Sequence, residues 1–454
     1  MKSIKKAFEL VEKLLGPQDV VIGDEYRPIS FCALVKRDEY MAAYNTLTGE
    51  LLLLDEKEYS ILNSDNIVAD GETAELIKKY FLVPVSHDDM QLRNEMLDFC
   101  KLLAPNDGKY DGYTVFTTTD CNARCFYCFE HGHKHLHMSD KIAEDTADYI
   151  LRTCKDKITL GWFGGEPLYN HGVIDIISSR LRASGIEYRS YMVSNAYLFD
   201  DECITKAAKD WNLKKVQITL DGTEEVYNRI KAYIYRDGRS PFKIVISNIE
   251  KLLKAGIAVD VRLNMDNNNF EDLCSLVEFI GERIGAGKGL HAYSVLLYEL
   301  PDKPNTIRSD IEREELNRKW LELEEKIFKL GLTRVKYLPD TPTTNRCMAD
   351  SKSNSMILPD GHLGKCEHYI DERFIGDIYT GVTNTEETAS FGERVDSSEI
   401  CRGCKLYPSC ISVKECPTSK VSGICNEAIR YNKEQGLYRS IVKTVKKYFD
   451  SESK

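Results

Sequence analysis

The residues best suited to chemistry in this 454-residue chain are its 15 cysteines. Three of them, Cys121, Cys125 and Cys128, are separated by three and then by two residues. Three thiolates at this spacing can hold one inorganic cluster, and three ligands on a four-iron cluster leave one iron open to a small molecule. The alternative is a structural zinc site completed by one histidine of the following loop, chosen from His131, His133, His135 and His137.

Seven further cysteines lie beyond residue 346 and are Cys347, Cys366, Cys401, Cys404, Cys410, Cys416 and Cys425. CxxC pairs on turns can hold zinc or iron–sulfur clusters. Seven thiols are one ligand short of two four-coordinate zinc sites, so a histidine such as His362 or His368 would have to complete them. The other five cysteines stand alone along the chain, and each is interpreted as a small buried hydrophobe.

Strand-like and helix-like segments alternate between about residue 108 and residue 337, and they must position the three-cysteine loop. The predicted strands are Tyr113–Thr118, Ile158–Phe163, Arg189–Val193, Val216–Leu220, Val259–Met265 and His291–Leu297. The predicted helices are Ser139–Lys155, Val173–Ala183, Asp201–Asp210, Phe242–Ala255 and Phe270–Ile284. Six such repeats predict an α/β fold whose parallel sheet curls into a partial or full barrel, with the active site at the C-terminal strand ends. A long charged helix, about residues 310–330, leads out of this region.

Composition excludes several classes of protein. Hydrophobic residues make up 42% and charged residues 29%, as in an ordinary globular protein, and the net charge of −11 argues against nucleic acid as a partner. No apolar run approaches the ~18–20 residues that span a bilayer. Glu9, Glu12 and Lys13 interrupt the N-terminal apolar stretch, which predicts an amphipathic helix rather than an export signal. We therefore expect a cytoplasmic protein with reduced thiols and no membrane contact.

Two smaller blocks flank the alternating region. Residues 1–98 contain predicted strands at Phe31–Val35, Tyr40–Tyr44 and Leu51–Leu54, and helices at Glu56–Leu62 and Glu72–Tyr80. This block carries no metal motif, so it is either a structural cap or a peptide-binding module with an exposed sheet edge. Residues 338–454 carry the seven later cysteines and a basic closing helix near Leu437–Tyr448, which we expect to be solvated.

The Cys121–Cys128 motif after the first barrel strand resembles the signature of the radical SAM superfamily. Gly164-Gly165-Glu166-Pro167 follows the second strand, as the GGEP motif of that family does. Glycine backbone can approach a ligand closely, and Glu166 can accept from an ammonium, which by resemblance belongs to S-adenosylmethionine (SAM).

Further residues match that family, two of these matches at strand ends. Ser194 and Asn195 end the third strand, where the family contacts the ribose and carboxylate of SAM, and Asp221 ends the fourth within an LDG sequence. Arg262 and Asn264 lie on the fifth strand, where the family often contacts the SAM carboxylate. Tyr127 matches the aromatic residue whose backbone lies near adenine. The family commonly has an arginine a few residues past LDG, and either Arg229 or Lys231 matches it. No catalytic side chain is assigned.

The later cysteines resemble the SPASM extension of radical SAM maturases, which holds two auxiliary [4Fe–4S] clusters. Carried over, the resemblance assigns Cys401, Cys404, Cys410 and Cys425 to an outer cluster. The inner cluster then receives Cys347, Cys366 and Cys416. Five residues rather than the usual three separate Cys410 from Cys416, so Cys416 departs from the pattern. With three cysteines, the inner cluster either takes a non-cysteine group or keeps a position for substrate.

Together these resemblances imply an enzyme that cleaves SAM reductively and uses three [4Fe–4S] clusters. The implied fold is a partial (β/α)6 barrel over 108–337, a winged-helix-like, PqqD-like recognition module over 1–98 and a SPASM domain over 338–454. The implied partners are a precursor peptide and an electron donor of the flavodoxin or ferredoxin type. The implied product is a thioether in a ribosomally made peptide. An anaerobic sulfatase maturase, a carbon–carbon crosslinking enzyme and a non-enzymatic metal scaffold are the alternatives.

Overall fold

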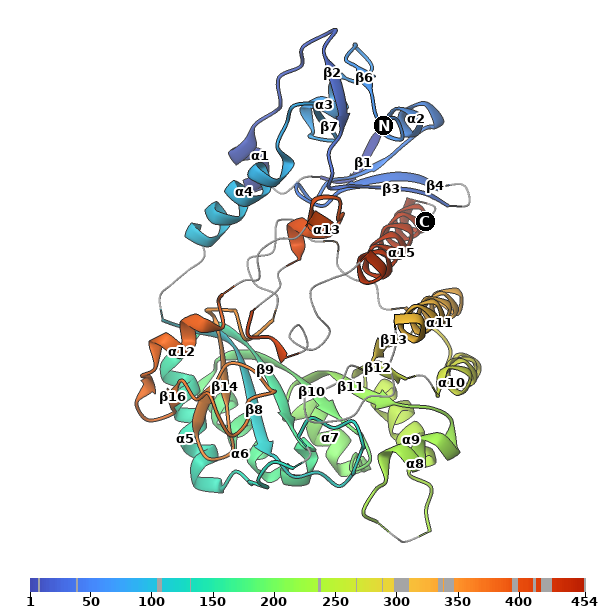
Figure 1. The fold of residues 1–454 in the computed structure, drawn as a ribbon. Coiled ribbons are helices and arrows are strands. Elements are labelled where there is room, and N and C mark those ends of the chain that lie inside the picture. The colour runs from blue at the N-terminus through green and yellow to red at the C-terminus, as the bar shows by residue number, and fades with distance from the viewer. Residues whose placement is uncertain are drawn as a thin grey trace.

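A large α/β sheet with its covering helices forms the body of the protein, and a smaller N-terminal module lies beside it (Figure 1). The computed structural model describes residues 1–6, 9–37, 40–103, 108–130, 132–235, 238–266, 268–287, 289–297, 310–333, 338, 347–393, 399–410, 414–417 and 427–452. No helix in these ranges is both long and apolar enough to cross a membrane.

Six parallel strands of the sheet pair in chain order, which confirms the predicted α/β architecture. They are β8 (Tyr110–Thr118), β9 (Cys154–Gly164), β10 (Glu187–Ser194), β11 (Leu213–Leu220), β12 (Ala258–Met265) and β13 (Leu290–Leu296). The first and last of them, β8 and β13, are not neighbours in the sheet order, so the barrel is open. An open barrel leaves room beside the C-terminal strand ends for segments from elsewhere in the chain.

Helices follow these strands, and three of them start at a side-chain cap. They are α5 (Asp140–Thr153), α6 (Gly172–Ser184), α7 (Asp201–Lys209), α8 (Glu224–Lys231), α9 (Pro241–Lys254) and α10 (Phe270–Arg283), with a short 3₁₀ helix η1 (Pro167–Asn170) after β9. The side chains of Ser139, Asp200 and Ser240 accept hydrogen bonds from the first-turn N–H groups of α5, α7 and α9. The short, charged helix α8 was not predicted.

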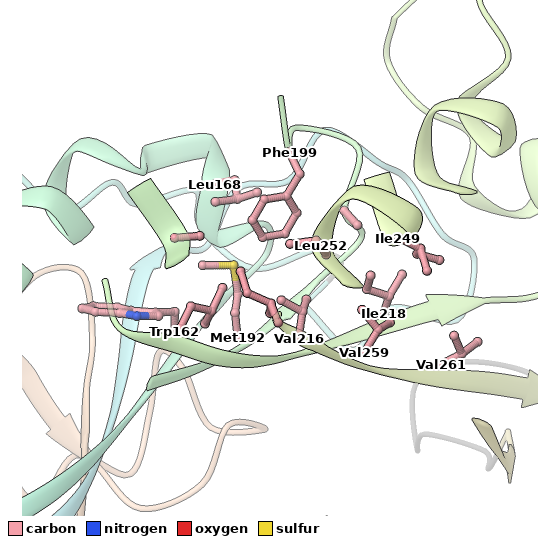
Figure 2. Close-up of a cluster of buried hydrophobic side chains, with 14 of the residues drawn as sticks. Trp162, Leu168, Met192, Phe199, Val216, Ile218, Ile249, Leu252, Val259 and Val261 are labelled. Atoms are coloured by element: carbon pink, nitrogen blue, oxygen red, sulfur yellow. The ribbon is translucent and has the colours of Figure 1, made fainter. Parts of the chain in front are cut away.

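The core lies between the sheet and the helices (Figure 2). Val259 and Val261 of β12 are fully buried there, with Ile249 and Leu252 of α9 above them (Figure 2). Side chains alternate along a strand, so Arg262 must lie on the opposite side of β12, toward the barrel interior. Burial of one face therefore fixes which polar residues face the site.

The region after residue 346 extends the same sheet. Strand β14 (Asn354–Ile357) pairs in parallel with β8, and β15 (His362–Gly364), β16 (Gly376–Asp377) and β17 (Gly381–Val382) continue in antiparallel pairs. Helix α11 (Asp310–Lys329) precedes this region. The other elements after residue 346 are α12 (Thr385–Ser390), α13 (Glu399–Arg402), η2 (Tyr407–Ser409) and α15 (Glu427–Glu452). Direct pairing of β14 with β8 anchors the later cysteines to the strand that precedes Cys121.

The N-terminal module contains two antiparallel sheets, in the orders β1-β5-β4-β3 and β6-β2-β7. Its elements are β1 (Lys2–Lys5), α1 (Glu9–Leu15), β2 (Glu25–Pro28), β3 (Cys32–Arg37), β4 (Tyr40–Asn45), β5 (Leu51–Leu53), α2 (Glu56–Leu62), β6 (Ile67–Val68), α3 (Ala74–Lys78), β7 (Leu82–Pro84) and α4 (Asp89–Leu103). The prediction that the chain opens with one amphipathic helix was wrong for residues 2–5, which form β1 because their backbone pairs with β5.

The expectation that the closing helix is solvated was also wrong. One side of α15 is buried against one face of the β1-β5-β4-β3 sheet, a contact visible in Figure 1. The buried helix residues are Leu437, Ile441, Val442 and Val445, and the buried sheet residues include Ala33, Val35, Ala42, Tyr44 and Leu51. The many lysines of α15 conceal an apolar stripe at helical spacing, which is what docks the helix.

Candidate active site

Cys121, Cys125 and Cys128 lie on the loop that leaves the C-terminal end of β8. They line a cavity of about 270 Å³ together with Thr119, Asp120, Ala123, Arg124, Glu130, Gly132, His135 and Gly165. Burial raises the pKa of Cys121, and the charges of Glu166 and of the other two cysteines add to the effect, so the three thiols face a common space. The loop thus gathers three thiols around a cavity at the expected strand end.

The two glycines of the GGEP sequence allow β9 to end against β8. A Cβ on Gly164 would lie 2.0 Å from the carbonyl oxygen of Thr118, and one on Gly165 would lie 2.3 Å from that of Asp120. Gly164 also has a φ of 126°, a conformation that glycine adopts at little cost. These glycines are thus required by the contact between two strand ends. The expected approach of a ligand to them stays a prediction.

Glu166 is fully buried, and both of its carboxylate oxygens accept hydrogen bonds from the protein. Oε1 accepts from the Leu168 N–H at 3.1 Å and from the Ser194 hydroxyl at 2.8 Å, and Oε2 accepts from the Asn195 N–H at 2.8 Å. Burial raises the pKa of Glu166 to about 7 despite these bonds. Glu166 therefore ties the end of β9 to the end of β10.

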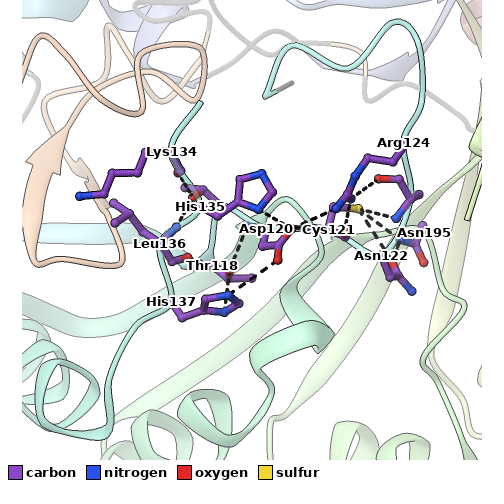
Figure 3. Close-up of polar contacts among 12 residues, drawn as sticks. Thr118, Asp120, Cys121, Asn122, Arg124, Lys134, His135, Leu136, His137 and Asn195 are labelled. Carbon is purple, nitrogen blue, oxygen red and sulfur yellow. Dashed lines mark hydrogen bonds and ion pairs between the residues drawn. The ribbon is translucent and has the colours of Figure 1, made fainter. Parts of the chain in front are cut away.

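Asn195 extends from β10 toward the cysteine loop (Figure 3). Its Nδ2 donates to the Asn122 Oδ1 at 2.7 Å and reaches the Cys121 sulfur at 3.7 Å. The next residue, Ala196, has a φ of 61°, which is unusual for a residue with a Cβ. The sequence pattern identified Asn195 but missed Asn122, which follows Cys121 and is fully buried.

Asp221, Lys231 and Tyr127 form a buried polar group beneath the cysteine loop. Lys231 Nζ lies 2.9 Å from Asp221 Oδ2 and donates to the Tyr127 hydroxyl at 2.9 Å. The Tyr127 hydroxyl donates to Asp221 Oδ2 at 2.7 Å. The side chains of Lys231 and Asp221 are 4% and 1% exposed, so neither faces bulk solvent. Because the carbonyl oxygen of Lys231 also accepts from the Arg124 N–H, this group connects α8 directly to the loop.

Arg262 and Asn264 lie on β12, and the alternation of side chains along this strand puts them on the side opposite the buried Val259 and Val261. Arg262 Nε donates to Asn264 Oδ1 at 3.0 Å. Burial lowers the pKa of His368. The charge of Glu367 opposes this shift, and the positive charge of Arg262 adds to it. Arg262 on β12 therefore lies near the later cysteine region.

The loop with His133, His135 and His137 lies next to the cysteine loop, where His135 and His137 point toward Asp120 (Figure 3). His135 lies 2.8 Å and His137 3.8 Å from the two carboxylate oxygens of Asp120. His133 lies 2.8 Å from Asp371, which follows β15. These three histidines thus lie beside carboxylates, and His131 lies outside the described residues.

The later cysteines fall in two places. Burial raises the pKa of Cys366 to about 12, with smaller contributions from the charges of Glu367, Cys347 and Cys416, so these three thiols are neighbours. The other described cysteines are Cys401, Cys404 and Cys410, on α13 and the turns that follow it, and Cys425 lies outside the described residues.

The N-terminal module holds the loop that carries Cys401–Cys410. Thr46 donates to the carbonyl oxygen of Lys405 at 2.5 Å, and Lys405 Nζ donates to the carbonyl oxygen of Ser30 at 3.0 Å. Arg93 of α4 lies over the ring of Tyr407, 4.3 Å from its centroid. The module is therefore bound to the later cysteine region.

Comparison with known proteins gives three kinds of match. Residues 115–280 match the model of the Radical SAM superfamily. A GTP 3',8-cyclase of Clostridium perfringens (strain 13 / Type A) is 27% identical over 285 residues, which cover 58% of this chain and 82% of the relative.

Two solved structures share the fold at low sequence identity. The enzyme anSMEcpe, with bound AdoMet and Cp18Cys peptide, has a TM-score of 0.56 at 14% identity and covers 75% of this chain and 99% of its own. Streptococcus suis SuiB, bound to precursor peptide SuiA, has a TM-score of 0.51 at 13% identity and covers 87% of this chain and 98% of its own.

The buried Lys231–Asp221 pair yields a stability prediction. Lys231→Met leaves the Asp221 carboxylate buried without its cation, so we expect the free energy of unfolding to fall by about 3–5 kcal/mol. Adding Asp221→Asn should recover most of this loss. Lys157→Met, which breaks the exposed pair with Glu187, should change stability by less than about 1 kcal/mol. Denaturant unfolding of the wild type and these three variants measures the effect, and equal losses for Lys157→Met and Lys231→Met would contradict it.

Proposed function

We propose that this enzyme of the radical SAM superfamily modifies a ribosomally made precursor peptide and joins a cysteine sulfur to a carbon as a thioether. The observation that carries the proposal is a contact between two residues that flank separate cysteine groups, Cys121–Cys128 and the group that contains Cys366. Phe129, next to Cys128, lies against His368, two residues after Cys366, with ring centroids 4.5 Å apart. A substrate reaching one group therefore passes close to the other, as bond formation between a sulfur and a nearby carbon requires.

The residues of the first pocket suit an iron–sulfur cluster. Three thiols surround a cavity of about 270 Å³, and within the described ranges no three Cys, His, Asp or Glu side chains are close enough to hold a single metal ion. This spacing favours a multi-atom cluster on Cys121, Cys125 and Cys128 over zinc. When bound there, the cluster supplies the electron for reductive cleavage of SAM.

The surrounding side chains position the loop and the cofactor. Glu166 and Asp221 hold strand ends and the loop in place through their partners. Asn195, at the end of β10, and Arg262 and Asn264, on β12, present amide and guanidinium groups, which suits contacts to the ribose and carboxylate of SAM. The hydroxyl of Tyr127 donates a hydrogen bond to Asp221, and this bond holds the backbone of Tyr127 in position within the cysteine loop.

Two auxiliary clusters form the second part of the proposal. Proximity of Cys347, Cys366 and Cys416 supports one three-cysteine cluster, whose fourth iron is available to a substrate thiolate. Cys401, Cys404, Cys410 and Cys425 are proposed to hold the other, next to the N-terminal module. Cys347, Cys366 and Cys416 would hold the three-cysteine cluster, and an open iron there would favour thiolate over thiol in an incoming cysteine.

The N-terminal module is proposed to bind the leader of the precursor in the manner of a winged-helix-like, PqqD-like recognition domain. Its longest edge strand is β3, with six residues and β4 as its neighbour in the sheet. Thr46 N–H donates to the carbonyl oxygen of Phe31, so Phe31 hydrogen-bonds toward the β4 side. In an antiparallel pair every second residue makes such bonds to its partner strand. The N–H groups of Leu34 and Lys36, which fall between those residues, therefore point away from β4. A leader strand added there gains main-chain hydrogen bonds. The peptide-bound structures with this fold, those of anSMEcpe and SuiB, support a peptide substrate.

Three other reactions remain as alternatives. Sulfatase maturation needs no leader module, and carbon–carbon crosslinking needs no thiolate capture. GTP cyclisation is suggested by the GTP 3',8-cyclase relatives. The alignment with the Clostridium perfringens relative covers 58% of this chain, so more than a third of the chain has no counterpart in that alignment. The experiments below separate these reactions.

Metal content tests the cofactor assignment. Anaerobic reconstitution should give about 12 iron and 12 sulfide per chain, for three [4Fe–4S] clusters. Replacing Cys121, Cys125 and Cys128 together by Ala should remove about a third of the iron and abolish SAM cleavage. Iron analysis and deoxyadenosine formation measure this, with Cys274→Ala as the control that changes neither. A colourless protein loaded with zinc would contradict the proposal.

Product analysis tests the reaction. With SAM, reductant and a small cysteine-containing precursor encoded beside this gene, the peptide should lose two hydrogen atoms for each thioether formed, as read by mass spectrometry. A precursor with its acceptor cysteine changed to serine should still permit SAM cleavage but gain no crosslink. A crosslink in the serine peptide would favour carbon–carbon chemistry, and consumption of GTP would favour cyclisation.

Edge-strand variants test leader binding without removing the module, whose deletion would expose the buried side of α15. Lys36→Pro removes an outward N–H of β3 and should weaken precursor binding about fivefold to tenfold. Lys36→Ala loses the same ammonium and its exposed pair with Glu56 but keeps the N–H, so it should bind normally. Isothermal titration with the precursor compares the two. Equal affinities would exclude leader addition at β3.

A further inference from the structure

Lys365 is a buried lysine that joins two of the segments that carry the later cysteines. It directly precedes Cys366 and is 6% exposed. Its Nζ donates to the carbonyl oxygen of Ser351 at 2.5 Å and to that of Asn354 at 3.2 Å. Both acceptors belong to the stretch that follows Cys347 in the chain. Lys365 therefore holds the Cys347 segment against the Cys366 segment.

The hydrogen bonds of Lys365 go to neutral carbonyl oxygens, whereas the buried Lys231 lies 2.9 Å from the Asp221 carboxylate. Burial lowers the pKa of Lys365 to about 8, and the charges of Asp350 and Cys347 oppose this shift. The ammonium is therefore the main form at pH 7. A buried ammonium is unfavourable unless an anion nearby balances its charge. This region thus holds a positive charge that an anionic group at the neighbouring thiols would offset.

The thiols beside Lys365 suit such an anion. The charges of Cys347 and Cys416 both act on Cys366, so these three thiols lie close together. Iron–sulfur clusters bound by thiolates carry negative charge, and reduction adds to it. A fixed positive charge nearby stabilises the reduced form more than the oxidised form, because Coulomb attraction grows with charge. The net charge around a cluster is accordingly one of the factors that set its reduction potential.

We propose that the ammonium of Lys365 raises the reduction potential of the cluster assigned to Cys347, Cys366 and Cys416 and so fits that cluster to accept an electron. This inference deepens the proposed function and rests on that assignment. When a thiolate, its proton lost to water, joins a carbon radical, the C–S bond uses two of their three electrons. The third electron must pass to an acceptor, and the higher potential favours its transfer to this cluster. Lys365 is a positioning residue in this account, because it acts through the cluster and touches neither peptide nor SAM.

Four substitutions separate the effect of charge from that of packing. Lys365→Met keeps the approximate length of the side chain and removes its charge, and Lys365→Arg keeps the charge. Asp350→Asn removes the opposing negative charge but keeps an oxygen for the Cys347 N–H, which lies 3.0 Å from Asp350 Oδ1. Lys443→Met is the matched control, because Lys443 on α15 is half-buried and also donates to a carbonyl oxygen, that of Thr333.

Redox titration followed by EPR spectroscopy measures the potentials in the reconstituted full chain. The three-cysteine motif after β8 is replaced by alanine in every sample, so the signals come from the two auxiliary clusters alone. Lys365→Met should make reduction of one of them about tenfold less favourable, which is a fall of about 59 mV for a one-electron couple. Lys365→Arg and Lys443→Met should leave both potentials unchanged, and Asp350→Asn should raise the potential that Lys365→Met lowers. Iron and sulfide content should be equal in all samples.

The outcomes separate this inference from the proposed function. A chain that keeps no iron without the first motif contradicts the auxiliary clusters and, with them, the proposed function. Full iron with unchanged potentials in Lys365→Met overturns the role of Lys365 alone. Equal falls in Lys365→Met and Lys365→Arg assign the effect to packing and also overturn it. Where Lys365→Met fails to hold iron, Asp350→Asn decides, since a raised potential supports the charge effect and an unchanged or lowered one overturns it.

Discussion

The site depends on one buried carboxylate, that of Glu166. Its backbone N–H donates to the carbonyl oxygen of Asp120, and its side chain accepts from Ser194 and Asn195. Three consecutive strand ends, β8, β9 and β10, thereby share one set of hydrogen bonds. Since the cysteine loop begins at Asp120 and Asn195 reaches the Cys121 sulfur, the position of the first thiol is set from two sides. In a buried position such bonds are strong, because water does not compete for the donors.

A second constraint joins the two cysteine regions through backbone rather than side chains. Strand β8 carries the three-cysteine loop at its end, and β14 of the later region pairs along its side. Phe129 against His368 and His133 against Asp371 add contacts at the loop itself. Because strands in a sheet are held at a nearly fixed spacing, the separation of the two thiol groups is built into the sheet and does not depend on a hinge between domains.

Much of the barrel could be predicted because its strands are apolar runs bounded by turns and its helices carry caps such as Ser139 and Asp200. Short elements with few apolar residues, such as α8 and β6, give no such signal. The docking of α15 was missed because its lysines outweigh Leu437, Ile441 and Val445, although their spacing of four residues was visible in the sequence. Within the site, the cysteines could be predicted from the number of residues between them, and Asn195 from its position at the end of a predicted strand. Glu130 could not, since only folding shows that its Oε2 has no hydrogen-bond partner among the described residues. The sequence left the choice between Arg229 and Lys231 open, and folding shows that Lys231 is buried against Asp221.

Docking of α15 onto the N-terminal sheet has a consequence for how the chain is made. The bond from Lys405 to Ser30 joins residues 375 positions apart, and the α15 contacts join residues still farther apart. At about 5–20 residues per second, translation of such an interval takes roughly 20–75 s. During that time Val35, Tyr44 and Leu51 emerge from the ribosome without the helix that covers them. Nascent chains with uncovered apolar sheet are prone to aggregate and depend on chaperones. Yield of soluble protein should thus be governed by the rate of synthesis, slower translation leaving the early sheet exposed for longer.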